Sequence, residues 1–359
     1  MELGQTLDKL LLIGSYTESL PHVVARGSGI TLVGLDSTSG RFATLSMCPD
    51  LRNPSYLAVS ADKNRIFAVE ELDETHGASV VALTLDRDTF AMRVTARHGA
   101  MGDCPCHVSL DQDEARVFVA NYMSGSVATY RIDAEAGILG AGQKIQRSGN
   151  GPNPERQEGP HAHQVVPSVQ GKGVFVCDAG TDEILHYPYS GHELAKTPDL
   201  VLNAPPGSLP RHLVQSHDGR RIYVVHELGC IIRSYACMHD GFEFTGEIGT
   251  LPAGDTCPSA CAAIRLHPNG RYLYASNRGH DSITAIAIGM DGTMSNIGTY
   301  ATRGECPRDF NISPSGDILV VANQNSHTLS AYRIDPVSGS LAELGEVYPI
   351  GSPTCVQFL

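Results

Sequence analysis

The chain has 359 residues and a formal net charge of −13, from 26 Lys and Arg against 39 Asp and Glu. An acidic chain without basic runs is a poor match for nucleic acid or an anionic membrane surface, so neither is expected as a partner. Its ten cysteines are scattered without zinc-site spacing, which favours buried thiols in a reducing compartment over disulfides or a metal centre.

The amino-terminal segment, residues 1–17, has a short apolar run and acidic residues where a secretory signal carries positive charge. It therefore predicts neither a signal peptide nor a membrane span, and we expect a cytoplasmic protein. Residues 11–17 instead resemble a β-strand of the repeats described next. Residues 29–40 resemble a further strand with its turn.

From residue 53 onward the sequence repeats itself. Each copy has a proline, an alternating run, a turn built on Asp, Asn, Gly or Ser, and a run rich in Val, Ile, Phe and Tyr, which together predict a β-hairpin. Residues 53–71 and 104–122 are the first two copies. The anchoring prolines, separated by 51, 55, 50, 48, 49 and 46 residues, are Pro54, Pro105, Pro160, Pro210, Pro258, Pro307 and Pro353.

A third strand follows each hairpin, as at residues 125–132, 283–289 and 329–335, and a shorter outer strand comes after a turn. Four strands in a period of about 50 residues are typical of propeller blades. The repeat at Pro353 is cut short, and the amino-terminal strands supply what it lacks. We predict an all-β, seven-bladed β-propeller with four antiparallel strands per blade, a single domain over residues 1–359, closed by N-terminal strands plus the C-terminal strand.

Polar residues at the hairpin ends should gather at one mouth of the central channel, because the first strand of each hairpin starts where the second strand ends. His163, Arg211 and Arg308 occupy the first-strand position, whereas Glu227 and Arg278 directly follow second strands. Guanidinium groups crowded around one channel repel each other unless carboxylates or an anion join them. Arginine also suits bidentate recognition of carboxylate or phosphate, so this mouth is predicted to bind an anion.

Other residues near this mouth admit either a structural or a functional role. His161 and His163 form an H-x-H pair that zinc could use, but no third ligand is evident, so we predict no metal and no cofactor. Asn277 ends a second strand, where asparagine often caps backbone groups, but it could also bind a ligand. Blade roles are expected for His107 and His212, and packing is expected for Tyr56 and Tyr122, which could also line the mouth.

Several segments resemble the family of seven-bladed lactonases, which includes the propeller-type bacterial 6-phosphogluconolactonases and the fungal carboxymuconate lactonizing enzyme. The most specific is residues 151–163, GPNPERQEGPHAH, an insertion that resembles the bacterial branch. The similarity runs from residue 13 to the last repeat. Its further segments are GSLPRHL (207–213), VVHEL (224–228), SNRG (276–279) and CPRDF (306–310).

The resemblance implies a metal-independent carboxylic ester hydrolase that opens a small anionic sugar lactone, with 6-phosphogluconolactone as the expected substrate. It also implies four catalytic residues, which are His163, Arg211, Glu227 and Arg278. Substrate binding is predicted for Arg308, His161, Arg156 and Asn277. In such a site Glu227 or His163 takes the proton, while Arg211 or Arg278 offsets the oxyanion charge.

Two alternatives stay open at this point. One is a lactonizing cycloisomerase acting on a muconate-type dicarboxylate, since the same fold supports both reactions. The other is a non-catalytic binding propeller, which would favour an aromatic top face, whereas this chain has no Trp. We expect a monomer or a weak homodimer.

Overall fold

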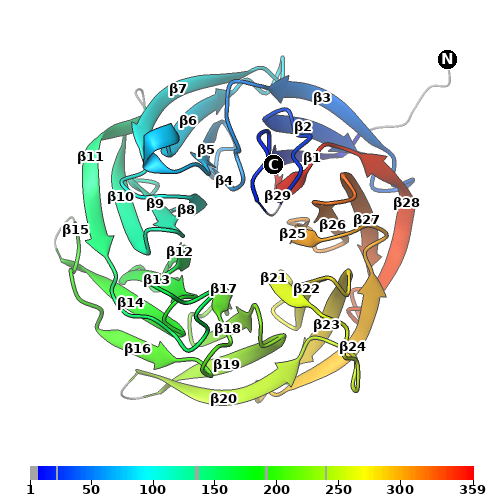
Figure 1. The fold of residues 1–359 in the computed structure, drawn as a ribbon. Helices are drawn as coiled ribbons and strands as arrows, with labels where there is room; N and C mark the ends of the chain where they lie inside the picture. The colour runs from blue at the N-terminus through cyan, green and yellow to red at the C-terminus, as the bar shows by residue number, and fades with distance from the viewer. Residues whose placement is uncertain (1–6, 22, 134–136, 191–192, 239–240) are drawn as a thin grey trace, which may run out of the picture.

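The computed structural model describes residues 7–21, 23–133, 137–190, 193–238 and 241–359. Over these ranges the chain forms seven antiparallel sheets in a ring around a central channel (Figure 1). Helical structure in the described ranges is limited to one 3-10 turn, η1 (Glu74–His76). The prediction of an all-β, seven-bladed propeller is therefore confirmed. No described helix is long and apolar enough to cross a membrane.

Each blade runs from an inner strand beside the channel to an outer strand at the rim (Figure 1). The inner strands are β29 (Pro353–Phe358), β4 (Leu57–Val59), β8 (Pro105–Leu110), β12 (Ala162–Pro167), β17 (Pro210–Gln215), β21 (Ala260–Leu266) and β25 (Pro307–Ile312). The second strands are β1 (Lys9–Ser15), β5 (Arg65–Glu70), β9 (Arg116–Asn121), β13 (Gly173–Asp178), β18 (Arg221–His226), β22 (Tyr272–Arg278) and β26 (Ile318–Asn323).

The outer half of each blade follows the same order. The third strands are β2 (Ile30–Leu35), β6 (Ser79–Leu85), β10 (Ser126–Asp133), β14 (Glu183–Ser190), β19 (Ile231–Met238), β23 (Ser282–Ile288) and β27 (Thr328–Ile334). The outer strands are β3 (Phe42–Cys48), β7 (Met92–Gly99), β11 (Gly137–Gln146), β20 (Gly241–Gly249), β24 (Met294–Ala301) and β28 (Leu341–Pro349). In the remaining blade two short strands share the outer edge of β14, namely β15 (Glu193–Leu194) and β16 (Leu200–Asn203).

The ring closes as predicted, with the carboxy-terminal strand β29 paired antiparallel to β1 and followed by β2 and β3. Leu11 lies opposite Phe358 in this pairing. Leu11 and Ile13 are fully buried and pack in one apolar cluster with Val320 and Ala331 of the neighbouring blade. Each blade thus buries its faces against its neighbours, and the closing blade ties both ends of the chain into a sheet.

Irregularities in the inner strands prepare the site. In β17, Pro210 pairs with His226 and His212 pairs with Val225, so that Arg211 is an extra, bulged residue. The same register shift occurs in β8, β12 and β25. A β-bulge re-aims a side chain out of the strand's normal alternation. The bulged residues of the four strands are Cys106, His163, Arg211 and Arg308.

Candidate active site

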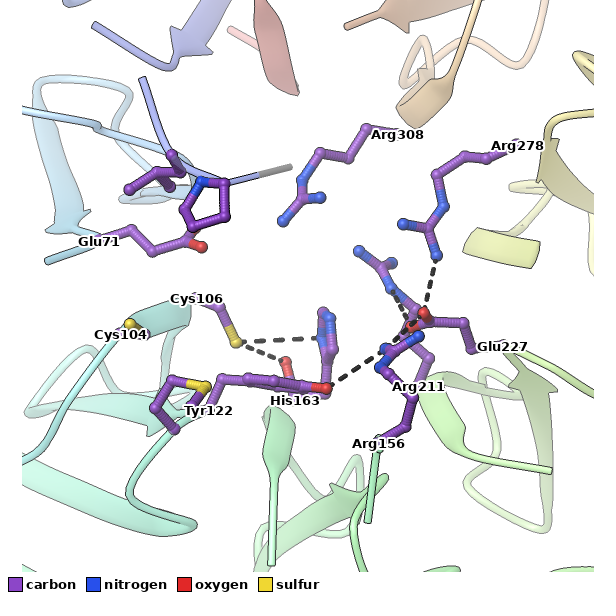
Figure 2. Close-up of a pocket in the computed structure, with 13 residues that line it drawn as sticks. Glu71, Cys104, Cys106, Tyr122, Arg156, His163, Arg211, Glu227, Arg278 and Arg308 are labelled. Atoms are coloured by element: carbon purple, nitrogen blue, oxygen red, sulfur yellow. Dashed lines mark hydrogen bonds and ion pairs between the residues drawn. The ribbon is translucent and has the colours of Figure 1, made fainter. Parts of the chain in front are cut away.

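A pocket of about 540 Å³ opens at one mouth of the central channel. All four bulged residues line it, together with the residues that end or directly follow β5, β9, β18 and β22. The amino-terminal loop and the segment 151–163 contribute the remaining wall. The complete lining is Leu20, Pro21, Glu71, Cys104, Cys106, Tyr122, Met123, Arg156, His163, Arg211, Glu227, Arg278 and Arg308 (Figure 2).

Three arginines surround the carboxylate of Glu227. Arg156 Nη2 lies 2.8 Å from Glu227 Oε1, and Arg278 Nη2 lies 3.3 Å from the same oxygen. Arg211 Nε lies 3.5 Å from Oε2, an ion-pair distance without hydrogen-bond geometry. Arg211 also donates from Nη1 to the carbonyl of Ala262 at 2.5 Å. We call Arg156, Arg211 and Arg278 the arginine cluster; Glu227 supplies the carboxylate that lets it form.

Burial and charge set the protonation states in this cluster. Burial opposes ionisation of Glu227, but the guanidinium groups of Arg278, Arg156 and Arg211 outweigh that effect and hold the pKa of the carboxyl well below its usual range. Burial and the neighbouring Arg278 lower the pKa of Arg211 to about 10. At neutral pH, therefore, Glu227 is ionised and the three arginines remain cationic.

A second, sparser group lies on the opposite side of the pocket. Figure 2 shows Glu71 and Glu227 pointing inward from opposite walls, with Arg308 beside Glu71. The Tyr16 hydroxyl donates to Glu71 Oε1 at 2.9 Å, while Glu71 Oε2 is buried without a hydrogen-bond partner among the described residues. The Arg308 guanidinium lies 5.2 Å from the centroid of the Tyr16 ring. We call Glu71, Tyr16 and Arg308 the Glu71 side.

Arg308 differs from the arginine cluster in its contacts. The interactions found for its side chain within the described residues include the Tyr16 ring but no ion pair and no hydrogen bond. A guanidinium carries five donors and stays charged at any working pH. Its donors face a pocket and remain available to an anionic group of a ligand.

His163 stands between the two sides. Burial, followed by the charge of Arg211, lowers its pKa well below the usual value, so the imidazole is neutral at pH 7. Its Nδ1 lies 4.0 Å from Cys106 Sγ, and its ring meets the Tyr122 ring edge to face at 5.5 Å. Tyr122 in turn accepts from Arg156 at 3.3 Å. His163 therefore offers a neutral nitrogen base to the pocket.

Two predicted ligand-binding residues do not line the pocket. Asn277 is fully buried, and its amide donates to the carbonyl of Thr250 at 3.2 Å and to Ser282 Oγ at 3.1 Å, which is the capping role. His161 precedes β12, stacks on Tyr122 at 4.5 Å, and approaches the Tyr122 carbonyl through Nδ1 at 2.9 Å. His161 therefore acts on the pocket only through Tyr122 in its wall, whereas Asn277 caps groups inside its own blade.

His107 and His212 were expected to have ordinary blade roles. They lie instead below the pocket, deeper in the channel. His107 packs on the Tyr56 ring at 4.3 Å, and His212 meets His163 edge to face at 5.2 Å. Burial, then the charges of Arg265 and Arg211, lowers the pKa of His107 to about 3. The floor of the site is thus built of neutral rings.

The described side chains offer no group of metal ligands. Within the described part of the chain, no three His, Cys, Asp or Glu side chains are arranged to hold a metal ion. His161 and His163 both contact the Tyr122 ring, His161 by stacking and His163 by its edge, and His161 Nε2 lies 3.2 Å from Glu158.

Glu71 is a site residue that was not predicted from the sequence, although a signal for it was present. Glu71 directly follows a second strand, as Glu227 and Tyr122 do, and this shared repeat position places all three on the pocket wall. Tyr122, expected to pack, also lines the pocket. Leu20 and Pro21 come from a loop outside the repeats, so no repeat position could predict them.

Residues 10–358 match the family model described as "Lactonase, 7-bladed beta-propeller". The chain therefore belongs to the seven-bladed β-propeller lactonase family. This family and its lactone chemistry agree with a pocket that pairs arginine with carboxylate and imidazole groups.

Among its relatives, the 6-phosphogluconolactonase of Bacillus subtilis is 28% identical over 350 residues, with 97% of each chain covered. The 6-phosphogluconolactonase of Formosa agariphila is 27% identical over 354 residues, covering 97% of this chain and 98% of the relative. The solved structure of the periplasmic gluconolactonase of Pseudomonas aeruginosa superposes with a TM-score of 0.89 at 29% identity, covering 98% of this chain and 99% of the other.

Proposed function

We propose that this protein hydrolyses a small anionic sugar lactone, converting 6-phosphogluconolactone to 6-phosphogluconate. The two relatives named 6-phosphogluconolactonase support this substrate class. The observation that carries the choice of an anionic substrate is Arg308, whose guanidinium lines the pocket with no ion pair or hydrogen bond found for it among the described residues. We assign the substrate's phosphate to this group, because a guanidinium fork matches phosphate oxygens bidentately.

The arginine cluster is assigned to the reacting carbonyl. Arg211 and Arg278 supply charge against the oxyanion that forms when water adds to the lactone, and their positions are fixed in advance by Glu227. Both oxygens of Glu227 already receive guanidinium contacts, so we assign this residue to holding the arginines. His163, kept neutral, is assigned to proton transfer.

A second candidate substrate is the unphosphorylated gluconolactone. It is supported by the neighbouring structure named as a periplasmic gluconolactonase. The phosphorylated lactone remains our first choice, because a neutral sugar has no group that needs the charge of Arg308. The muconate-type cycloisomerase stays a further possibility for a pocket with several arginines. We further propose one domain acting in the cytoplasm as a monomer or weak homodimer, with no cofactor, nucleic acid or membrane as partner.

The function is tested by following, at constant pH, acid release from freshly made 6-phosphogluconolactone and gluconolactone and proton uptake by a carboxymuconate, each corrected for its spontaneous rate. We expect fast turnover of the phosphorylated lactone, slower turnover of gluconolactone and no cyclisation of the muconate. EDTA should leave the rate unchanged, because the proposed roles need no metal. Loss of activity with EDTA, restored by a divalent cation, would contradict these roles.

A further inference from the structure

A small, enclosed cavity lies beneath the pocket and shares part of its wall. Its volume, measured as the space open to the centre of a water-sized sphere, is about 10 Å³. That is roughly the room one water molecule requires. The residues that line both the pocket and this cavity are Glu71, Cys106, His163, Arg211 and Arg308.

The lining of this cavity is polar, and several of its buried polar atoms have no partner among the described residues. Glu71 Oε2 and Ser55 Oγ are buried and have no hydrogen-bond partner among the described residues. The same holds for both ring nitrogens of His212. Ser55 is 4% exposed and Glu71 7% exposed, so bulk water does not satisfy these atoms. Buried polar atoms that the protein leaves unpaired are usually satisfied by an ordered water with two to four partners.

The two carboxylates of the pocket differ in how many of their oxygens still lack a partner and can accept a hydrogen bond from this water. Glu227 has Arg156 and Arg278 on one oxygen and Arg211 on the other. Glu71 receives one hydrogen bond, from Tyr16 to Oε1, and its Oε2 is unpaired. A lone pair on Glu71 is therefore available at the boundary between the cavity and the substrate pocket.

We propose that Glu71, with Ser55, binds the hydrolytic water in this cavity and that Glu71 is the catalytic base that activates it. This inference rests on the proposed lactonase function and adds to it the place from which the water attacks. In that step, Glu71 Oε2 takes a proton from the water as the water oxygen bonds to the lactone carbonyl carbon. The carbonyl electron pair moves onto its oxygen, which faces the arginine cluster.

The second half of the reaction restores the site. The carbonyl re-forms and the bond to the ring oxygen breaks, and that oxygen receives the proton held by Glu71, directly or through His163. The new carboxylic acid loses its own proton to solvent. One water is consumed, no redox partner is needed, and Glu71 ends as a carboxylate ready for another water.

The kinetic test compares Glu71→Gln with Glu70→Gln as a matched control. Glu70 is the preceding residue, but its carboxylate is bound by Ser79 and Arg97 inside the blade, away from the pocket. For Glu71→Gln we expect kcat on 6-phosphogluconolactone to fall by about a hundredfold or more, the usual contribution of a general base. KM and the Kd for inorganic phosphate should not rise by more than about threefold, because the amide keeps the shape of the side chain and the variant removes a negative charge beside Arg308.

The pH profile separates a base from a structural residue. With its base removed, the Glu71→Gln enzyme should hydrolyse the lactone in proportion to hydroxide concentration between pH 5.5 and 7.5, whereas Glu70→Gln should keep the wild-type profile. A kcat of Glu71→Gln within about threefold of wild type would overturn the role of this residue as a base. So would a loss confined to KM.

A crystal structure of the wild-type protein provides the independent test. It should show a water within hydrogen-bond distance of Glu71 Oε2 and Ser55 Oγ, and density without such a water would overturn the site. If Glu71→Gln does not fold, Ser55→Ala serves in its place, with an expected loss in kcat of about three- to tenfold from one weakened water contact. If wild type hydrolyses no lactone, the proposed function and the catalytic role fail together, and the density alone decides the water site.

Discussion

Each side of the pocket carries a glutamate at the same repeat position, but the two glutamates have different roles. Glu227 and Glu71 each directly follow a second strand, β18 and β5 respectively. Glu227 forms ion pairs with three guanidinium groups, whereas the carboxylate of Glu71 accepts one hydrogen bond, from a tyrosine hydroxyl. The comparison shows that the surrounding side chains decide what a carboxylate does, as with other paired acids in active sites.

The arginine cluster should produce the largest effect when it is broken. Arg278→Ala removes a guanidinium that we assign to the oxyanion, and loss of one such donor lowers kcat by about a hundred- to a thousandfold. Steady-state kinetics on 6-phosphogluconolactone measure this. Arg333→Ala is the control, because Arg333 contacts the Ser37 carbonyl far from the pocket and should retain wild-type kcat. Equal losses in both variants would point to a general effect on the fold.

Glu227→Gln sharpens the comparison by removing the charge that organises this cluster. We expect kcat to fall by about a hundredfold, because the arginines lose their common anchor. The affinity for the product 6-phosphogluconate should stay the same or increase, since three guanidinium groups are freed to bind an anion. Calorimetric titration of the product measures this. A weaker Kd with unchanged kcat would contradict the assigned role of Glu227.

On the Glu71 side, Arg308 should show its effect through substrate choice. Arg308→Ala removes the proposed phosphate contact, and a charge-assisted bidentate contact is worth roughly 1.5–3 kcal/mol. We therefore expect kcat/KM for 6-phosphogluconolactone to fall by about ten- to a hundredfold, while that for gluconolactone changes by less than about threefold. Equal losses on both lactones would remove the phosphate site from Arg308 and give it a part in the chemistry or the fold.

The floor of the pocket gives the smallest expected effect. His107 has a pKa of about 3 in the folded protein, below the value of an unfolded histidine. Between these two values the unfolded state binds more protons, so the free energy of unfolding falls as the pH falls below about 6.5. His107→Phe should reduce this slope by up to about 1.4 kcal/mol per pH unit, as measured by urea unfolding at several pH values. An unchanged slope would mean that His107 is protonated in the folded state.

Much of the fold was predictable because propeller blades repeat their hydrophobic pattern. The predicted third strands at 125–132, 283–289 and 329–335 differ by one residue from β10, β23 and β27. The bulges are less visible in sequence, since an extra residue in a strand has no consistent side-chain signature. The register nevertheless predicted that Arg211 and Arg308 face one mouth, because the same spacing recurs in each blade.

The parts of the site that were not predicted have physical reasons. Asn277 pairs with Cys261, one pair before the end of its hairpin, and its amide reaches the Thr250 carbonyl inside the blade instead of the channel. His161 lies before the bulge, so its ring does not follow His163 into the pocket. Glu71 was not predicted as a site residue because a single acidic residue at that repeat position forms no recognisable charge pattern in the sequence. Its importance depends on Ser55 of the same repeat and on Tyr16, which comes from the closing blade.

The central claim is that Arg308 holds the phosphate of the substrate, while the arginine cluster and Glu71 act on its lactone carbonyl. A crystal structure with bound 6-phosphogluconate tests it most directly. We predict the phosphate within hydrogen-bond distance of Arg308 and the product carboxylate within reach of Arg211 and Arg278, with Glu71 beside the carboxylate carbon. A phosphate seated on the arginine cluster, or product bound outside this pocket, would contradict the account.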